Sequence, residues 1–404
     1  MGVNESISIP PTYRSNMYNG NTCSRVPAMP PKRKKIEKNQ TRKIIQSNPS
    51  KPYFLPQPTL FKMSFSGIWS IIYPQSLAPS PRIGSFSVCN EVTEKIYIGY
   101  GTDPNGVMMN DIWKFDLRSK KWKMIVIEKQ LLPRTNCSAT IDQETSMIYV
   151  FGGEINGCEY VGQLHSINPN NGKVRIYDYD SDKDAPSNRF SPIIQFYKKK
   201  IFLWGGSDGD KNLSNLYIFD LLELKWRVKT IDVQGRVDSP WCLYENKVYS
   251  YGGSKNTNLL IFDLDEEKVE QESCIGNQPP ADETGGCMLR VNNFIMYFGG
   301  KSQTNWSLLY ALDLKRHWWY VFYILPDGVT TTINNGRINE FGLFMLPHSY
   351  HLAAGYSNTE RTLFITLGSS FKNPPSIHAF SIGEALSIIN LRDDILESLY
   401  FFMN

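Results

Sequence analysis

Short hydrophobic runs separated by polar turns recur along residues 65–383 and predict a chain built almost entirely of β-strands. In the clearest copy, residues 201–204 form an apolar run that ends at the pair Gly205-Gly206, and a polar loop then leads to a second run at residues 216–220. Runs of four or five apolar, β-branched and aromatic residues bounded by glycine are typical of strands buried on both faces. The pattern therefore predicts buried strands.

Six copies of this unit follow one another. The strand-ending pairs are Tyr100-Gly101, Gly152-Gly153, Gly205-Gly206, Gly252-Gly253, Gly299-Gly300 and Leu367-Gly368. The second run of the first five units ends at Asp116, Asn168, Asp220, Asp263 and Asp313, and six residues later come Trp122, Val174, Trp226, Val269 and Trp319. Self-similarity with a period near 50 residues indicates a repeat architecture.

The combination of a Gly-Gly strand end, an aromatic in the next strand and a Trp beyond the turn resembles the kelch repeat, and the resemblance covers residues 65–383. It implies an all-β fold, a β-propeller in which each repeat forms one four-stranded blade. We expect six blades. Val174 and Val269 depart from the Trp of the family and should be weaker wedges between blades.

The two ends of the repeat region predict how the ring closes. The last unit lacks a Trp strand, whereas residues 68–72 around Trp69 provide one before the first unit. We expect this N-terminal strand to complete the last blade, which removes the exposed sheet edges of an open array.

Three segments depart from the repeat. Residues 1–60 are rich in Pro, Asn, Ser and Lys and predict a disordered basic arm. About 20 extra residues near 325–347 contain an Asn335-Gly336 turn and predict an extended hairpin or a projecting loop. Residues 384–404 show apolar positions at helical spacing and predict a short C-terminal helix that docks on the propeller or meets a partner.

The arm concentrates positive charge. It holds ten basic and two acidic residues, so it carries +8 and the rest of the chain −4, against a total of +4. Two motifs lie in it: an N-myristoylation pattern at Gly2, and a basic run typical of nuclear import or of an anionic membrane contact, formed by Lys32, Arg33, Lys34 and Lys35. A solvated tail without a targeting role is the alternative, and no specific nucleic acid is expected for the body of the propeller.

The seven Cys are scattered and form no C-x-x-C pair, and no signal-peptide core or 20-residue apolar run occurs. We therefore expect reduced cysteines and a cytoplasmic or nuclear protein, with peripheral membrane association through the arm as the alternative. The five His are not grouped at ligand spacing, so no metal and no cofactor are expected.

Candidate partner-binding residues come from two places. Four arginines recur 16 or 18 residues before their glycine pairs, and they would either line a funnel mouth suited to an acidic peptide or tie each strand to a neighbouring loop: Arg82, Arg134, Arg189 and Arg236. Glu283 and His351 take this place in the last two units. The loops after the glycine pairs vary most and contain three aromatic candidates, Tyr160, Trp306 and Phe371.

The resulting expectation is a kelch propeller that acts as a scaffold or adaptor by presenting loops to a protein or peptide partner, without catalysis. The alternative is a sugar-acting enzyme similar to N-acetylneuraminate epimerase, which resembles this chain in its number of blades. That alternative requires Arg, Glu and His side chains that converge on the axis of the ring.

Overall fold

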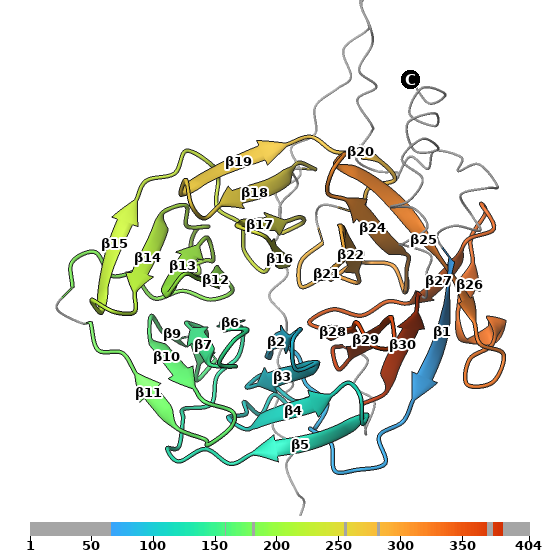
Figure 1. Cartoon of the computed structure of the whole chain (residues 1–404), viewed down its shortest axis with the longest axis horizontal. Coiled ribbons are helices and arrows are strands. Elements are labelled where there is room, and N and C mark those ends of the chain that lie inside the picture. The colour runs from blue at the N-terminus through green and yellow to red at the C-terminus, as the bar shows by residue number, and fades with distance from the viewer. Residues whose placement is uncertain are drawn as a thin grey trace, which may run out of the picture. The chain divides into compact units, whose positions relative to one another are not determined.

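The computed structural model describes residues 66–157, 159–179, 182–253, 257–280, 283–369 and 375–382. These residues form six four-stranded antiparallel blades around a central axis, as a six-bladed propeller requires (Figure 1). The expected basic arm at 1–60 and the expected helix at 384–404 lie outside the described residues.

Each blade runs from an inner strand at the axis to an outer strand at the rim (Figure 1). Blade 1 comprises β2 (Phe86–Asn90), β3 (Lys95–Gly99), β4 (Ile112–Asp116) and β5 (Lys121–Ile125). Blade 2 comprises β6 (Ser138–Ile141), β7 (Ile148–Phe151), β10 (Leu164–Ile167) and β11 (Val174–Ile176). Blade 3 comprises β12 (Ile193–Tyr197), β13 (Lys200–Trp204), β14 (Leu216–Asp220) and β15 (Lys225–Lys229). Blade 4 comprises β16 (Trp241–Tyr244), β17 (Lys247–Ser250), β18 (Leu259–Asp263) and β19 (Lys268–Glu272). Blade 5 comprises β21 (Cys287–Val291), β22 (Phe294–Phe298), β24 (Leu309–Asp313) and β25 (Trp318–Pro326). Blade 6 comprises β28 (Ala353–Ser357), β29 (Thr362–Thr366), β30 (Ile377–Ser381) and β1 (Ser66–Ile72).

The hydrophobic core lies between the blades, because each sheet buries both faces against its neighbours. Trp226 on β15 illustrates the packing: its ring lies 6.2 Å from Phe151 of blade 2 and 4.9 Å from Phe219 of its own blade. The glycine pairs fit the crowded strand ends. Gly205 has φ +74°, and a Cβ on it would lie 2.6 Å from the carbonyl oxygen of Arg236 in the next blade, so a larger residue would push the blades apart.

The ring closes as the sequence predicts. β1 pairs with β30 in antiparallel register, Trp69 opposite Phe380, so the N-terminal strand supplies the outer strand of blade 6. Trp69 is fully buried, and its indole Nε1 donates to Nδ1 of His378 at 3.1 Å.

Blades 5 and 6 also share one continuous sheet. The far end of β25 pairs in parallel with β1, so Tyr323 lies opposite Ser66 and Leu325 opposite Ile68. The loop after β25 continues along the same edge of β1, because the Thr331 hydroxyl donates to the Trp69 carbonyl at 2.6 Å and the Ile71 N–H donates to Thr330 Oγ1 at 2.9 Å, while β30 pairs with the opposite edge. The N-terminal strand is therefore clasped on both edges.

The insertion at 325–347 contains a hairpin, but its turn differs from the predicted one. The strands β26 (Arg337–Ile338) and β27 (Phe344–Pro347) are joined through residues 339–343, where Asn339 Oδ1 accepts the N–H groups of Phe341 and Leu343. Asn335 and Gly336 instead end the 3₁₀ helix η1 (Ile333–Asn335). The prediction of an Asn-Gly hairpin turn at this place was wrong, because Thr332 and Asn335 cap each other's backbone and start the helix there.

Candidate functional site

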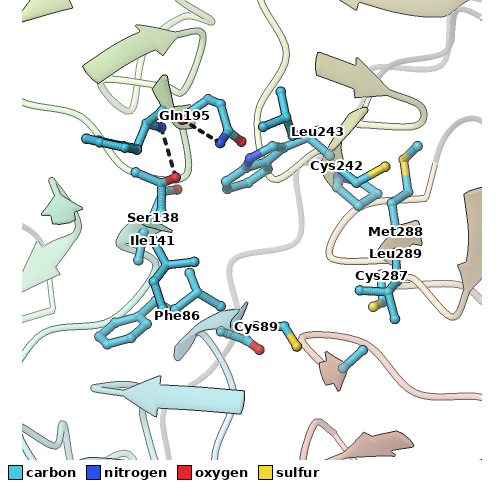
Figure 2. Close-up of a pocket in the computed structure, with 18 of the residues that line it drawn as sticks. Phe86, Cys89, Ser138, Ile141, Gln195, Cys242, Leu243, Cys287, Met288 and Leu289 are labelled. Atoms are coloured by element: carbon cyan, nitrogen blue, oxygen red, sulfur yellow. Dashed lines mark hydrogen bonds between the residues drawn. The ribbon is translucent and has the colours of Figure 1, made fainter. Parts of the chain in front are cut away.

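A cavity of about 680 Å³ lies on the axis of the propeller, lined by the inner strands of all six blades (Figure 2). Its wall mixes apolar side chains such as Phe86, Ile141 and Leu243 with hydroxyl and amide groups such as Ser138 and Gln195. Its volume falls in the range of small-molecule pockets. Acidic side chains such as Glu91 and Glu144 and basic side chains such as Lys198 and Arg290 line it as well, so the wall carries charges of both signs.

Four cysteines also line the cavity, Cys89, Cys137, Cys242 and Cys287, and Figure 2 labels three of them, Cys89, Cys242 and Cys287. Burial raises the pKa of the Cys89 thiol, with a smaller contribution from Glu91, and burial raises the pKa of the Cys287 thiol, in both cases to about 12. The thiols are therefore protonated at neutral pH and are weak nucleophiles. The five cysteines of the described ranges are free.

One mouth of the cavity is a closed ring of hydrogen bonds made by one residue from each blade. All six residues have positive φ: Gly84, Asn136, Ser191, Asp238, Gly285 and His351. Each N–H from blade 2 to blade 6 donates to the carbonyl of the preceding member, at 2.7 to 3.2 Å. The last link differs, because Gly84 N–H donates to the imidazole Nδ1 of His351 at 3.0 Å.

His351 also reaches across the mouth, where its Nε2 lies 3.0 Å from Asp238 Oδ2 of blade 4. Since Nδ1 accepts from Gly84, the proton of the neutral ring lies on Nε2 and is donated to Asp238. Both ring nitrogens are therefore engaged, and neither is available as a general base without breaking the ring. This geometry favours a structural role for the one His–Asp pair at the mouth.

The four repeated arginines lie inside the blades and do not face the funnel. Arg82, Arg134, Arg189 and Arg236 are at most 1% exposed. Their guanidinium groups donate to main-chain carbonyls at the glycine-pair ends, as Arg134 Nη1 does to Gly152 at 3.2 Å and Arg189 Nη1 does to Gly205 at 3.2 Å. Arg82 adds an ion pair with Asp111. Contact with a partner would require unfolding, so burial supports the alternative interpretation that each Arg ties its strand to a loop.

Blade 6 places Ser349, and not His351, at the arginine position. In blades 2 to 6 the backbone carbonyl at the arginine position accepts the N–H of the second residue of the glycine pair in the preceding blade, as in Arg134 with Gly101 at 2.9 Å and Ser349 with Gly300 at 3.1 Å. The assignment of His351 to this position was wrong by two residues. The hairpin between β28 and β29 is two residues longer than those of blades 3 to 5, so the spacing to the glycine pair is 18, as in blades 1 and 2.

The loops after the glycine pairs gather on the face that surrounds this mouth. In four blades the residue just before the ring residue forms an isolated β-bridge with the loop that follows the glycine pair of the same blade. Examples are Thr135 with Glu154 and Phe190 with Ser207. We call this the loop face. It is the surface on which the chain differs most from blade to blade.

Tyr160 lies on the loop face but packs on the neighbouring blade. It belongs to the small hairpin of β8 (Glu154–Ile155) and β9 (Glu159–Tyr160), and its ring lies 4.9 Å from that of Phe190. It is half-buried and joins the loops of blades 2 and 3. Tyr160 therefore has a packing role, and part of its ring remains accessible to a partner.

Trp306 lies in a second small sheet on the loop face. It belongs to β23 (Trp306–Ser307), which pairs with β27, and β27 pairs with β26, so the loop of blade 5 and the insertion form one three-stranded unit. The side chain of Trp306 is half-buried. Phe371, the third aromatic candidate, lies outside the described residues, as do Gly2 and the basic run from Lys32 to Lys35.

Sequence reasoning missed the apolar surface of the insertion. Five of the 17 large hydrophobic side chains that are exposed among the described residues fall within residues 325–341: Leu325, Val329, Ile333, Ile338 and Phe341. Concentrated exposed apolar side chains mark interaction sites more often than isolated ones do. The signal available in the sequence was the combination of apolar residues with a segment that has no counterpart in the other five units.

The described residues bear on the sugar-acting alternative and on metal binding. The arginines do not converge on the axis, which removes the main feature that the sugar-acting alternative requires. Within the ranges that the structure describes, no group of three His, Cys, Asp or Glu side chains could hold a metal ion. No helix in those same ranges is long and apolar enough to cross a bilayer.

Part of the chain matches a known domain family. Residues 146–331 match the domain described as the KLHDC2/KLHL20/DRC7 Kelch-repeats domain. The matched segment runs from blade 2 to the start of the insertion after blade 5.

Three curated relatives are similar to parts of this chain at low identity. The leucine-zipper-like transcriptional regulator 1 homolog of Drosophila melanogaster is 22% identical over 59% of this chain and 26% of its own length. The Ras guanine nucleotide exchange factor F of Dictyostelium discoideum is 23% identical over 40% of this chain and 15% of its own length. The kelch domain-containing protein 1 of Mus musculus is 23% identical over 66% of this chain and 57% of its own length. The matched region is thus less than two thirds of each of these relatives.

Proposed function

Because the chain belongs to the kelch-repeat family of β-propellers, we propose that it is a protein-interaction module that binds a protein or peptide partner through the loop face. Propellers of this family are typically non-catalytic binding domains. The adaptor role, the identity of the partner and the surface it uses belong to the proposal.

The observation that carries the proposal is the three-stranded unit on the loop face between blades 5 and 6. Its edge strand β26 is exposed along both residues, and Ile333, Ile338 and Phe341 are 63%, 56% and 50% exposed. A rigid scaffold that presents a cluster of apolar side chains on a blade-specific loop has the composition of a partner-binding surface. The half-buried Trp306 and Tyr160 extend the same face.

The rigid frame beneath these loops supports recognition without conformational change. The ring from Gly84 to His351 fixes the starts of the six inner strands relative to one another. The buried arginines fix the glycine-pair ends from which the loops leave. Pre-organised loops bind with a smaller loss of conformational entropy than mobile ones.

We further propose that the arm, through Lys32, Arg33, Lys34 and Lys35, contributes localisation by an import receptor or an anionic membrane, with Gly2 as a lipidation site. The charge of +8 over residues 1–60 supports this assignment.

The test is proximity labelling in cells with the tagged full chain and with a variant that carries Ile333→Ser, Ile338→Ser and Phe341→Ser. We expect the variant to fold, because all three side chains are exposed, and to lose a defined set of neighbours. The matched control is Leu222→Ser, since Leu222 is 81% exposed in a turn between β14 and β15. An identical set of labelled proteins for wild type and triple variant would contradict the proposed surface.

A further inference from the structure

Blade 1 carries a basic surface that lies apart from the loop face. We call it the blade 1 lysine patch: Lys95, Lys114, Lys121 and Lys123. Lys114 lies directly opposite Lys123 across β4 and β5, and Lys95 and Lys121 flank Asp116 in the neighbouring register. Residues opposite each other in antiparallel strands share one face, with Cβ atoms about 5 Å apart. Four ammonium groups and one carboxylate therefore share one side of this sheet.

The opposed positive charges of the patch destabilise the protein when no partner is bound. Burial lowers the pKa of the Lys114 ammonium, and the nearby charges of Lys95 and Lys123 lower it further. Like charges directly opposite each other across strands destabilise a sheet. Among the described residues, no ion pair of blade 1 involves a lysine of the patch: the pairs are Arg82 with Asp111, Glu91 with Arg290, Arg118 with Glu94 and Lys120 with Glu360. Asp116 is the carboxylate that lies opposite Lys95 and Lys121 in the register.

Protection of the sheet edge does not explain the patch. Lysines on an outer strand prevent edge-to-edge pairing, which would account for Lys121 and Lys123 on β5. Lys114, however, lies on β4, which is hydrogen-bonded on both sides to β3 and β5. A partly buried lysine at a paired interior position serves no such purpose.

Between blades 3 and 4, the residue equivalent to Lys123 has a carboxylate partner that Lys123 lacks. The registers Phe115 opposite Trp122 and Phe219 opposite Trp226 make Lys123 equivalent to Arg227. Arg227 forms an ion pair with Glu267, four residues after Asp263 of β18. The equivalent residue of blade 2, four residues after Asn168, is Gly172, which has no side chain and lies so close to Val126 that a Cβ would clash with its carbonyl oxygen. The neighbouring blade therefore has no side chain at the position from which Glu267 reaches Arg227.

We propose that the blade 1 lysine patch binds an acidic peptide segment of a protein partner, whose carboxylates take the place that Glu267 occupies between blades 3 and 4. The patch is confined to one sheet face, which suits a short run of carboxylates better than the extended charge of a membrane or a nucleic acid. The body of the chain is otherwise mildly acidic, so the positive potential is local. This inference is independent of the loop face.

The test measures binding of a fluorescent 12-residue peptide of alternating Glu and Ser to the full chain by anisotropy, with the Gln and Ser peptide of the same length for comparison. We expect Lys114→Gln with Lys123→Gln to weaken binding about tenfold, since each exposed charge contributes a few-fold. Lys114→Arg with Lys123→Arg should retain binding. The matched control is Lys211→Gln with Lys225→Gln on blade 3, which removes the same charge from exposed positions and should change binding less than twofold.

Thermal unfolding gives the second measurement. Removal of the opposed charges should leave the melting temperature of the Gln variant unchanged or higher, so weaker binding cannot be attributed to unfolding. Equal affinity of wild type and Gln variant for the acidic peptide would overturn the proposal. Tighter, patch-dependent binding of phosphatidylserine vesicles or of a single-stranded oligonucleotide would overturn the choice of a peptide. A gain of peptide binding on Asp393→Asn with Asp394→Asn would identify the chain's own acidic C-terminal segment as the occupant and would also overturn it.

Discussion

His351 of blade 6 accepts a hydrogen bond from the backbone of Gly84 in blade 1, and this contact closes the ring at the mouth of the axial cavity. The other five links are backbone to backbone, so this is the one link of the ring that depends on a side chain. It lies where the last blade, completed by the N-terminal strand, meets the first. Ring closure therefore rests on two separate devices, the strand β1 and the His351 side chain.

Loss of the His351 imidazole should weaken this closure. His351→Leu leaves the Gly84 N–H and the Asp238 carboxylate without their partner, and we expect a loss of about 1–3 kcal/mol in the free energy of unfolding. Urea denaturation measures it. Asp238→Asn retains an acceptor for Nε2–H and should cost less than about 1 kcal/mol. Equal stability of His351→Leu and wild type would show that the link contributes nothing.

Glu94 should make the free energy of unfolding depend on pH in the acid range. Burial alone would raise the pKa of this carboxyl group, but hydrogen bonds from Arg118, Thr359 and Ser357 outweigh burial and lower the pKa to about 2. The stabilisation is present above the ordinary value of 4.5 and is lost as the pH falls from 4.5 towards 2. Glu94→Gln should lower the free energy of unfolding by about 2 kcal/mol at pH 7, and its difference from wild type should shrink below pH 4.5. Glu223→Gln at an exposed turn is the control, and a constant difference across the acid range would contradict the assignment.

The clasp on β1 should depend on one hydroxyl group. Thr331 is fully buried and donates to the carbonyl of Trp69. Thr331→Val keeps the shape and removes this bond, so we expect a loss of about 1–2 kcal/mol and faster amide exchange in β1, measured by hydrogen–deuterium exchange. Val329→Ala at an 87% exposed neighbour is the control. Exchange in β1 that matches wild type would argue against the clasp.

The buried arginines should affect stability and not partner affinity. Arg134→Met removes the bonds to the Gly152 carbonyl and to Gln163 Oε1, and we expect a loss of about 2–4 kcal/mol, because buried acceptors remain unpaired. Arg134→Lys should not restore it, since a single ammonium cannot span both acceptors. Arg337→Met, at an exposed position of β26, should change the melting temperature little. A stable Arg134→Met variant with reduced partner binding would reverse this conclusion.

The arm should determine where the protein resides. Replacing Lys32, Arg33, Lys34 and Lys35 by Gln should abolish nuclear or membrane enrichment of the tagged full chain, because the charge that an import receptor or an anionic lipid surface recognises is removed. Gly2→Ala separates the two destinations, since it prevents only lipidation. Cell fractionation and imaging measure both, and a distribution unchanged by either variant would leave the arm without a targeting role.

Much of the candidate site could not be foreseen from the sequence. The arginines recur at regular spacing, and periodicity cannot distinguish a ring that faces a funnel from one that faces the inside of each blade. Their burial is decided by the path of the glycine-pair loops, whose carbonyls surround the guanidinium groups. The sequence assigned the arginine position of blade 6 to His351, whereas the structure places Ser349 there. The longer hairpin between β28 and β29 changes the number of residues to the glycine pair without changing the position in the sheet. The blade 1 lysine patch needs strand register, since Lys114 and Lys123 are nine residues apart and meet only across β4 and β5.

The sequence by itself determined the six-bladed architecture and its closure by the strand around Trp69. Both follow from local repetition: each unit carries its own buried strands and glycine pair, and one unit lacks an outer strand that the N-terminus supplies. The tertiary structure decided which polar side chains are buried and which apolar ones are exposed. It placed the arginines inside, joined His351 to Gly84 and Asp238, and left Ile333, Ile338 and Phe341 on the surface. These outcomes depend on contacts between residues of different blades, and no pattern within one repeat encodes them.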